Sequence, residues 1–242
     1  VAEQTRGKLS AVVPSGLLTP EARLVTASLV SLKAPWETPF VPNRTRSRVF
    51  HAPQRDIEVN MMSEAVYTKF ADLEELQVLA LNYADPALSM WFVMEKQPTD
   101  RKWLTGLEDS LSNNQLNSWQ AACKEQLVNV EIPRFAFQTS ANLQSSLEHL
   151  GVRRIFSQQE ADLRRMSPER PFGMEFMLHQ ARIDVDEEGT EAAAATMVGY
   201  FGGGDPQSAT FRADHPFLFL IRDNRTGAIL FLGRVMNPSS AR

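Results

Sequence analysis

The alternation of hydrophobic and polar residues predicts a chain built mostly from short β-strands. Apolar and β-branched residues tend to alternate with small or polar ones over Ala22–Leu32, which is typical of a strand. Leu79, Leu81 and Tyr83 alternate in the same way, as expected of a half-buried antiparallel strand. Further strands are predicted at Arg46–Phe50, Ile57–Met62, Val66–Ala71, Leu76–Tyr83, Ser89–Glu95, Leu127–Phe137 (divided by Pro133) and Glu175–Val185.

Leucine spacing predicts three short helices among these strands. Leucines recur at helical spacing from Leu104 to Leu111, and Leu116–Ala122 continues the pattern. A third helix is expected over Asn142–Leu150, with Gly151 placed to cap it. Leu143, Leu147 and Leu150 would form one face of that helix.

Turn signals complete the outline of the fold. Prolines after Leu32 end the first strand, and Trp36 and Phe40 stand in the broken region as expected anchors. Near the end of the chain, Phe217–Ile221 and Ala228–Val235 flank a turn containing Asn and Gly, which predicts a β-hairpin. The element order indicates an α+β fold with large, mainly antiparallel sheets and few helices.

Composition and charge exclude several classes of function. A length of 242 residues with 43% hydrophobic and 22% charged residues describes a globular chain. The net charge of −4 argues against a nucleic-acid partner, and apolar stretches such as Phe217–Ile221 are too short to span a membrane. A single cysteine, Cys123, and four dispersed histidines make a metal site or a disulfide framework improbable. No hydrolase-like arrangement of Ser, His and Asp stands out, so neither an enzyme nor a cofactor is expected.

The most informative segment runs from Asp186 to Val198. Three acidic residues, Gly189 and Thr190 lead toward four consecutive alanines. Alanine has the highest helix propensity, so the run alone is equally compatible with an ordinary helix. Small residues throughout also suit a segment that alternates between an external loop and a strand inserted into a sheet.

Several short motifs occur along nearly the whole chain. They are Trp36–Phe40, Val59–Met62, Ile132–Phe135, Leu147–Phe156, His179–Ala181, Glu187–Thr196, and Asp214–Phe217 through Asn237–Pro238. In their residues and in their order these motifs resemble those of one family, the serpins, which inhibit serine proteases. The resemblance implies a serpin-like fold with an exposed reactive loop at about residues 187–210. It also implies that residues 1–242 form a partial serpin domain, because the amino-terminal helices and strands of the family are absent and Val1–Leu9 would be the end of a helix.

In this family a protease attacks the reactive loop and becomes acylated, and the cleaved loop then inserts as a new strand of the main sheet. The resemblance therefore implies a suicide inhibitor with a covalently bound serine protease as its partner. The implied loop hinge comprises Glu187, Glu188, Gly189, Thr190, Glu191, Ala192, Ala193, Ala194, Ala195 and Thr196. Gly189 would act as the pivot, and Thr190, Ala192, Ala194, Thr196 and Val198 would share the buried face after insertion.

The bond that the protease would cleave is expected between Phe201 and Gly202, with Tyr200, Gly203 and Gly204 as alternative positions. An aromatic residue before the bond favours a chymotrypsin-like target, and an elastase-like target is a further expectation. Two alternatives remain open. The chain could belong to a non-inhibitory, serpin-like binding or chaperone protein, or it could be a truncated fragment without function.

Three residues resemble the region where the family's main sheet opens. Trp36 corresponds to a tryptophan below the loop entry, and His179 to a histidine that holds the central strands together. The usual asparagine partner of that histidine aligns with Ser28, a shorter side chain, which departs from the family pattern. The resemblance further implies a monomeric, extracellular protein without a nucleic-acid or membrane partner, although no signal peptide is present in this chain. Asp186, Glu187 and Glu188 are expected to form a solvated turn rather than a metal site.

Overall fold

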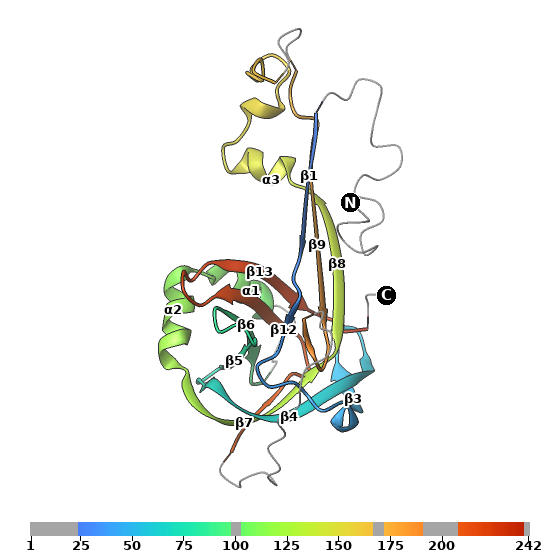
Figure 1. Ribbon diagram of the computed structural model, residues 1–242, viewed down its shortest axis with the longest axis vertical. Coiled ribbons are helices and arrows are strands. Elements are labelled where there is room, and N and C mark those ends of the chain that lie inside the picture. Colours follow the sequence, from blue (N-terminus) through green and yellow to red (C-terminus); the bar gives the residue numbers. More distant parts are fainter. Residues whose placement is uncertain (1–23, 98–102, 167–171, 191–207, 240–242) are drawn as a thin grey trace. The chain divides into compact units, whose positions relative to one another are not determined.

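The computed structural model describes residues 24–97, 103–166, 172–190 and 208–239, without the side chain of Trp103 (Figure 1). The helix end expected at Val1–Leu9 lies outside the described residues. The chain divides into two compact units. The first unit comprises residues 1–32 and 137–183, and the second comprises residues 33–136 and 184–242. Thirteen strands and three α-helices occur in the described residues, which confirms the α+β class and the predominance of strands.

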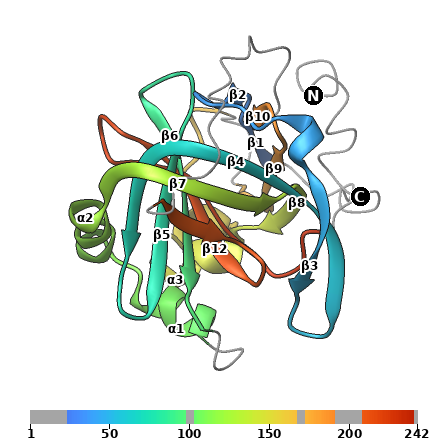
Figure 2. The same ribbon diagram turned by 90° about the horizontal axis from the view of Figure 1, so that it is seen from below.

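The second unit is built on an eight-stranded sheet (Figure 2). Its strands follow one another in the order β11-β7-β4-β5-β6-β12-β13, and β3 pairs with β4. All neighbours are antiparallel except β11 and β7, which are parallel. The strands are β3 (Arg46–His51), β4 (Asp56–Asp72), β5 (Leu76–Asn82), β6 (Leu88–Glu95), β7 (Lys124–Pro133), β11 (Ala209–Arg212), β12 (Phe217–Asp223) and β13 (Ile229–Val235). The predicted hairpin is confirmed as β12 and β13, whereas β11 was not predicted.

Strand β4 corrects the expectation of two separate strands at Ile57–Met62 and Val66–Ala71. It is one strand of 17 residues with Glu64 in its middle. The polar side chain does not break the strand, because its carboxylate forms an ion pair with Arg44 and accepts a hydrogen bond from the amide of Ala65. Such partners offset part of the desolvation cost of a buried charge.

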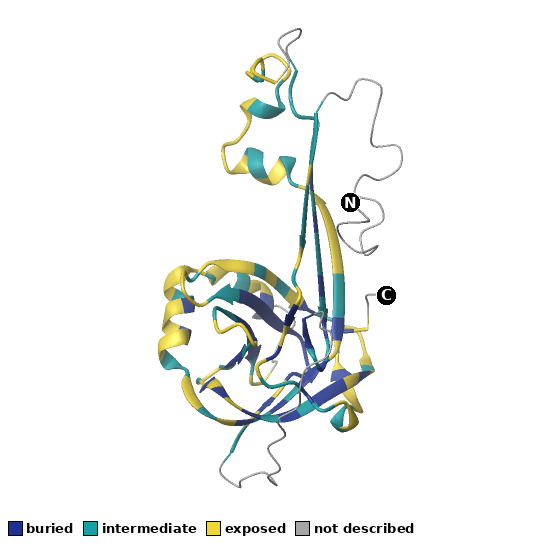
Figure 3. Cartoon of the chain, in the orientation of Figure 1, coloured by how far each residue is buried: buried dark blue, intermediate teal, exposed yellow. Residues whose placement is uncertain are grey.

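The central strands β5, β6 and β12 are buried on both faces of the sheet, as the buried positions in Figure 3 illustrate. Helices α1 (Trp103–Ser110) and α2 (Asn113–Ala122) cover one face, where Trp119 packs against Val78, Ala80 and Trp91. The prediction that Leu79 and Leu81 lie on a half-buried strand is therefore wrong. Both helices were predicted, but their packing against this face of the sheet was not. Phenylalanines pack edge-on or tilted on the opposite side of the core, among them Phe70, Phe92, Phe135, Phe211, Phe217 and Phe219.

The first unit contains β1 (Val25–Ser31) parallel to β9 (Phe176–Val185), whose last two residues belong to the second unit. Strand β8 (Phe135–Asn142) also pairs with β9. The predicted helix at Asn142–Leu150 is shorter, because β8 continues to Asn142 and α3 spans Gln144–His149. Gly151 follows α3 with a φ of +92°, as a capping glycine does. Leu150 is 79% exposed, so the expected leucine face is not formed in full.

Candidate functional site

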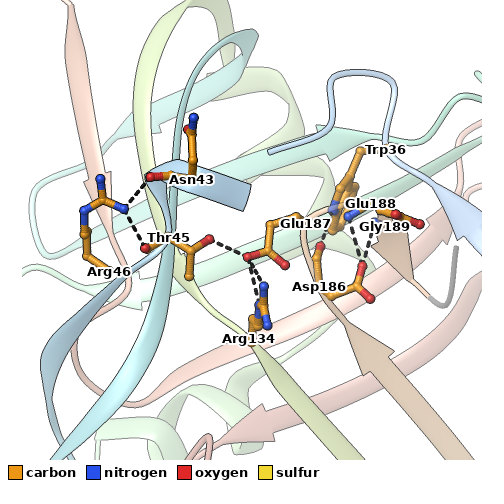
Figure 4. A network of polar contacts seen from close by, with 9 residues as sticks. All are labelled: Trp36, Asn43, Thr45, Arg46, Arg134, Asp186, Glu187, Glu188 and Gly189. Atoms are coloured by element: carbon orange, nitrogen blue, oxygen red, sulfur yellow. Dashed lines mark hydrogen bonds and ion pairs between the residues drawn. The ribbon is translucent and has the colours of Figure 1, made fainter. Parts of the chain in front are cut away.

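A tight turn connects β9 to the start of the predicted hinge (Figure 4). The Asp186 carboxylate accepts hydrogen bonds from the amides of Glu188, at 2.9 Å, and Gly189, at 3.2 Å. The Asp186 amide in turn donates to the Gly189 carbonyl at 3.0 Å. The short acidic side chain thus satisfies backbone amides that a sharp turn leaves unpaired. Burial raises the pKa of Asp186, and the neighbouring Glu187 and Glu188 add to this effect while the two amides oppose it.

The residues after this turn form a strand of the sheet. Strand β10 (Gly189–Thr190) lies between the end of β9 and β2 (Ala34–Pro35). Thr190 is opposite Val185 of β9 on one side and opposite Ala34 of β2 on the other, and both pairings are antiparallel. Thr190 is 0% exposed. The first hinge residues are therefore seated in the sheet.

Gly189 is required here by its backbone and by its surroundings. Its φ is +150°, a conformation that residues with a side chain rarely adopt. A Cβ at this position would lie 2.3 Å from the carbonyl oxygen of Ala34 and 2.6 Å from Cα of Pro35. The glycine thus lets β10 approach the backbone of β2 closely.

The segment from Trp36 to Phe40 holds the turn from the other side. The amide of Trp36 donates to the Glu188 carbonyl at 2.9 Å, and its indole nitrogen donates to the Asp186 carbonyl at 3.0 Å. The amide of Phe40 donates to the Glu187 carbonyl at 2.8 Å. Trp36 and Phe40 are each 2% exposed, which confirms that both are buried anchors.

Glu187 is a buried anchor, contrary to the expectation of a solvated turn. It is 4% exposed, and its carboxylate accepts hydrogen bonds from the guanidinium of Arg134 and the hydroxyl of Thr45. Burial alone would raise the pKa of Glu187, but these two hydrogen-bond donors outweigh it and hold the pKa below its ordinary value. The bonds tie the base of the hinge to the junction of β7 and β8 and to the residue before β3.

Tyr83 contacts the hinge from the end of β5. Its ring stacks on the indole of Trp36 with the centroids 4.7 Å apart and the planes 7° from parallel. Its hydroxyl oxygen lies 2.6 Å from the hydroxyl oxygen of Thr190. Burial raises the pKa of Tyr83, and the hydrogen bond with Thr190 lowers it only in part. The phenol is therefore neutral in the folded protein at any moderate pH.

In the first unit the structure brings together the other two predicted residues of the sheet-opening region. Ser28 of β1 is the register partner of His179 of β9. Register partners on adjacent strands project from the same face of a sheet, so these two side chains are neighbours. No hydrogen bond joins these two side chains in the part of the chain that the structure describes, which agrees with the shorter reach of serine. Trp36 belongs to the second unit and is described there.

The remaining predicted loop residues lie outside the described residues. These are Glu191, Ala192, Ala193, Ala194, Ala195 and Thr196 of the hinge and Tyr200, Phe201, Gly202, Gly203 and Gly204 around the expected cleavage position. Strand β11 starts at Ala209, inside the expected loop range of about 187–210.

The three acidic residues of the turn do not converge on a common point. Asp186 binds backbone amides and Glu187 binds Arg134, and no cluster of three or more His, Cys, Asp or Glu residues that could hold a metal occurs in the described ranges. Along the same ranges, no helix has the length and apolar character needed to cross a membrane.

Sequence reasoning missed the partners that fix the hinge. Arg134 belongs to a motif noted in the sequence, but nothing there indicated that it pairs with Glu187, 53 residues further along. Tyr83 and Thr190 are 107 residues apart. The one local signal for this ion pair was Arg134 directly after Pro133, and a basic residue in that position does not identify its acidic partner.

Comparison with known proteins places this chain in a family. A family model described as serpin (serine protease inhibitor) matches residues 1–238. The chain is 36% identical over 244 residues to serpin B9 of Homo sapiens, covering 98% of this chain and 64% of that protein. It is also 36% identical over 244 residues to the leukocyte elastase inhibitor of Homo sapiens, covering 97% of this chain and 64% of that protein.

The fold agrees with this assignment. The crystal structure of native protease nexin-1 with heparin superposes with a TM-score of 0.85 at 24% identity, covering 98% of this chain and 64% of that one. The chain thus spans slightly less than two thirds of the length of these proteins. The comparisons lend no support to the extracellular location expected above. With its family model, its relatives and its fold in agreement, the chain belongs to the serpin family.

Proposed function

We propose that the protein inhibits a serine protease by trapping it, and that the trap closes when the cleaved loop inserts between β9 and the chain segment that contains β1 and β2. The observation that carries this proposal is the position of β10. In the first unit β9 pairs directly with β1, whereas in the second unit β10 separates the end of β9 from β2. The loop thus already contributes one short strand at the place where a longer inserted strand would begin.

The direction of pairing supports an energetic reason for insertion. The β1–β9 pairing is parallel, whereas β10 is antiparallel to both of its neighbours. A strand that continues from Thr190 would replace one parallel ladder by two antiparallel ladders, which are slightly more stable per residue. Each added hydrogen bond contributes about 1 kcal/mol net, so a strand of roughly ten residues would stabilise the cleaved form by several kcal/mol.

The residues beyond Thr190 are compatible with burial in such a strand. Ala192, Ala194 and Thr196 follow Thr190 at every second position, and each is small. Cleavage between Phe201 and Gly202 would leave enough chain after Thr190 for a full strand. An aromatic residue before this bond favours a chymotrypsin-like target, and the name of the leukocyte elastase inhibitor motivates elastase as a second candidate. In this proposal the protein is not itself an enzyme.

The test uses the protein together with any sequence that precedes residue 1 in its gene. It is incubated with chymotrypsin and, separately, with elastase, and the products are separated on a denaturing gel. A band at the mass of the protease plus the inhibitor without residues 202–242, the fragment that acylation at Phe201 releases, supports the proposal. Cleavage in the loop without that band identifies a non-inhibitory relative, and general digestion identifies a chain that does not fold.

A further inference from the structure

A hydrogen bond joins the hydroxyl group of Tyr83 to that of Thr190, the hinge residue that is seated in the sheet. Tyr83 is 1% exposed and Thr190 is 0% exposed, and their hydroxyl oxygens lie 2.6 Å apart. The Tyr83 ring is held by its stacking on Trp36, and Trp36 in turn binds the turn before β10 through its indole nitrogen. The phenol therefore faces the hinge from a fixed position.

We propose that Tyr83 is a positioning residue that keeps Thr190 in the sheet and thereby prepares the site where loop insertion starts. This inference rests on the proposed function, because it assigns the regulation of that same hinge. Tyr83 has no catalytic role in this proposal, because it would affect the protease only through the position of the loop.

The hydroxyl groups of Tyr83 and Thr190 depend on each other for a strong hydrogen-bond partner. Among the described residues, the Thr190 hydroxyl has Tyr83 as its hydrogen-bond partner, and the Tyr83 hydroxyl has only the sulfur of Met90, at 3.7 Å, besides Thr190. Sulfur is a weak acceptor, so release of the hinge leaves the buried phenol poorly satisfied. An unsatisfied buried hydroxyl is costly, and this cost favours the seated hinge.

A seated hinge has two consequences for inhibition. It draws the start of the loop into the sheet, and it removes the slow first step of strand insertion, because β10 is already paired with β2 and β9. After cleavage, insertion competes with hydrolysis of the acyl bond. A hinge that is seated in advance thus directs more of the acylated protease into the trapped complex. Loss of the Tyr83 hydroxyl should raise the number of inhibitor molecules consumed for each protease trapped.

The closest test is hydrogen exchange of the backbone amides of residues 186–190. Tyr83→Phe and Thr190→Val each remove one hydroxyl and keep the shape of the side chain. Since a neutral hydrogen bond corresponds to roughly a five-fold change in an equilibrium, each variant should exchange these amides about five-fold faster. The double variant should exchange no faster than either single variant, because both remove the same bond. Thr190→Ser, which keeps a hydroxyl, should restore protection.

Tyr67→Phe is the matched control. Tyr67 is 68% exposed on β4, so removal of its hydroxyl should leave exchange at residues 186–190 unchanged. Unchanged exchange in both Tyr83→Phe and Thr190→Val, or fully additive effects in the double variant, would overturn the proposal. If Tyr83→Phe does not fold, Thr190→Val tests the same bond from the other side.

The exchange measurement separates this inference from the proposed function. Hydrogen exchange measures the seating of the hinge without any protease. The absence of a covalent complex in the wild type would therefore refute the proposed function and leave the exchange result unaffected. Where the wild type does trap chymotrypsin, the two variants should consume several-fold more inhibitor per trapped protease. Unchanged consumption in variants with faster exchange would refute the link between seating and trapping.

Discussion

The carboxylate of Glu187 is buried and accepts hydrogen bonds from two nitrogens of the Arg134 guanidinium, Nε at 2.8 Å and one of the terminal nitrogens. Arg134 is the more exposed partner, with 44% of its side chain accessible to solvent. The ion pair therefore fixes the base of the hinge while the cation retains part of its hydration.

Replacement of Glu187 should destabilise the protein. Glu187→Ala removes the bonds to Arg134 and Thr45, and we expect the free energy of unfolding to fall by about 2 kcal/mol, as is typical for hydrogen bonds to charged groups. Denaturant unfolding measures this change. Glu188→Ala is the control, because the Glu188 side chain has no hydrogen-bond partner among the described residues. Equal effects of the two variants would contradict the anchoring role of Glu187.

The contribution of Glu187 should depend on pH. Because its pKa is lowered in the folded protein, its contribution is present above the unfolded pKa of about 4.3 and is lost as the pH falls through the folded value. The difference in unfolding free energy between the wild type and Glu187→Gln should therefore be larger at neutral pH than at about pH 3. A difference that does not change with pH would show that the carboxylate is not ionised in its pair.

Asp186 should behave in the opposite sense. Its pKa is raised in the folded protein, so its negative charge costs stability at neutral pH and this cost disappears on protonation. Asp186→Asn keeps an oxygen for the amides of Glu188 and Gly189 and removes the charge. We expect a small gain in unfolding free energy at neutral pH, below about 1 kcal/mol, that vanishes in acid. A loss at neutral pH would refute this assignment.

Gly189 should not tolerate a side chain. Gly189→Ala places a Cβ against the Ala34 carbonyl and forces alanine into a positive φ, which costs on the order of 1–3 kcal/mol. Thermal unfolding should show a clear decrease. The matched control is Gly106→Ala in α1, where nothing lies within 4 Å of the new Cβ and alanine favours the helix. We expect that control to be neutral or stabilising, and a comparable loss in both variants would contradict the close approach of β10 to β2.

The pairing of Ser28 with His179 predicts a stabilising change. Ser28→Asn introduces a longer amide directly opposite the histidine, in reach of a new hydrogen bond worth about 1 kcal/mol. A higher unfolding temperature is expected. Ala27→Asn, at an exposed position of the same strand, is the control. If the two substitutions change the unfolding temperature by the same amount, the position opposite His179 gives no additional stabilisation.

Local patterns predicted most elements of this fold because strand and helix periodicities are local properties. The patterns gave wrong predictions where tertiary contacts determine the extent of a strand or the burial of its residues. Two strands were predicted on either side of residues 63–65, yet the ion pair with Arg44 allows Glu64 to remain inside the single strand β4. Leu79 and Leu81 looked half-buried, yet α1 and α2 cover the second face of their sheet.

The candidate site, too, could be predicted only in its local part. The acidic turn and Gly189 are contiguous in the sequence, so the hinge could be recognised from local residues. Its anchors could not, because Thr45, Arg134 and Tyr83 come from segments far from the hinge in the chain. The burial of Glu187 follows from those distant partners, and an acidic run alone is more typical of a solvated turn.

The proposed function requires the loop that begins at Thr190 to insert into the sheet and to trap an acylated protease. The most direct measurement is a denaturing gel of the protein after incubation with chymotrypsin, followed by mass spectrometry of any complex. We predict a band that withstands detergent and in which the protease is esterified to the carbonyl of Phe201. Complete conversion to a cleaved loop with fully active protease, and no such band, would contradict the account.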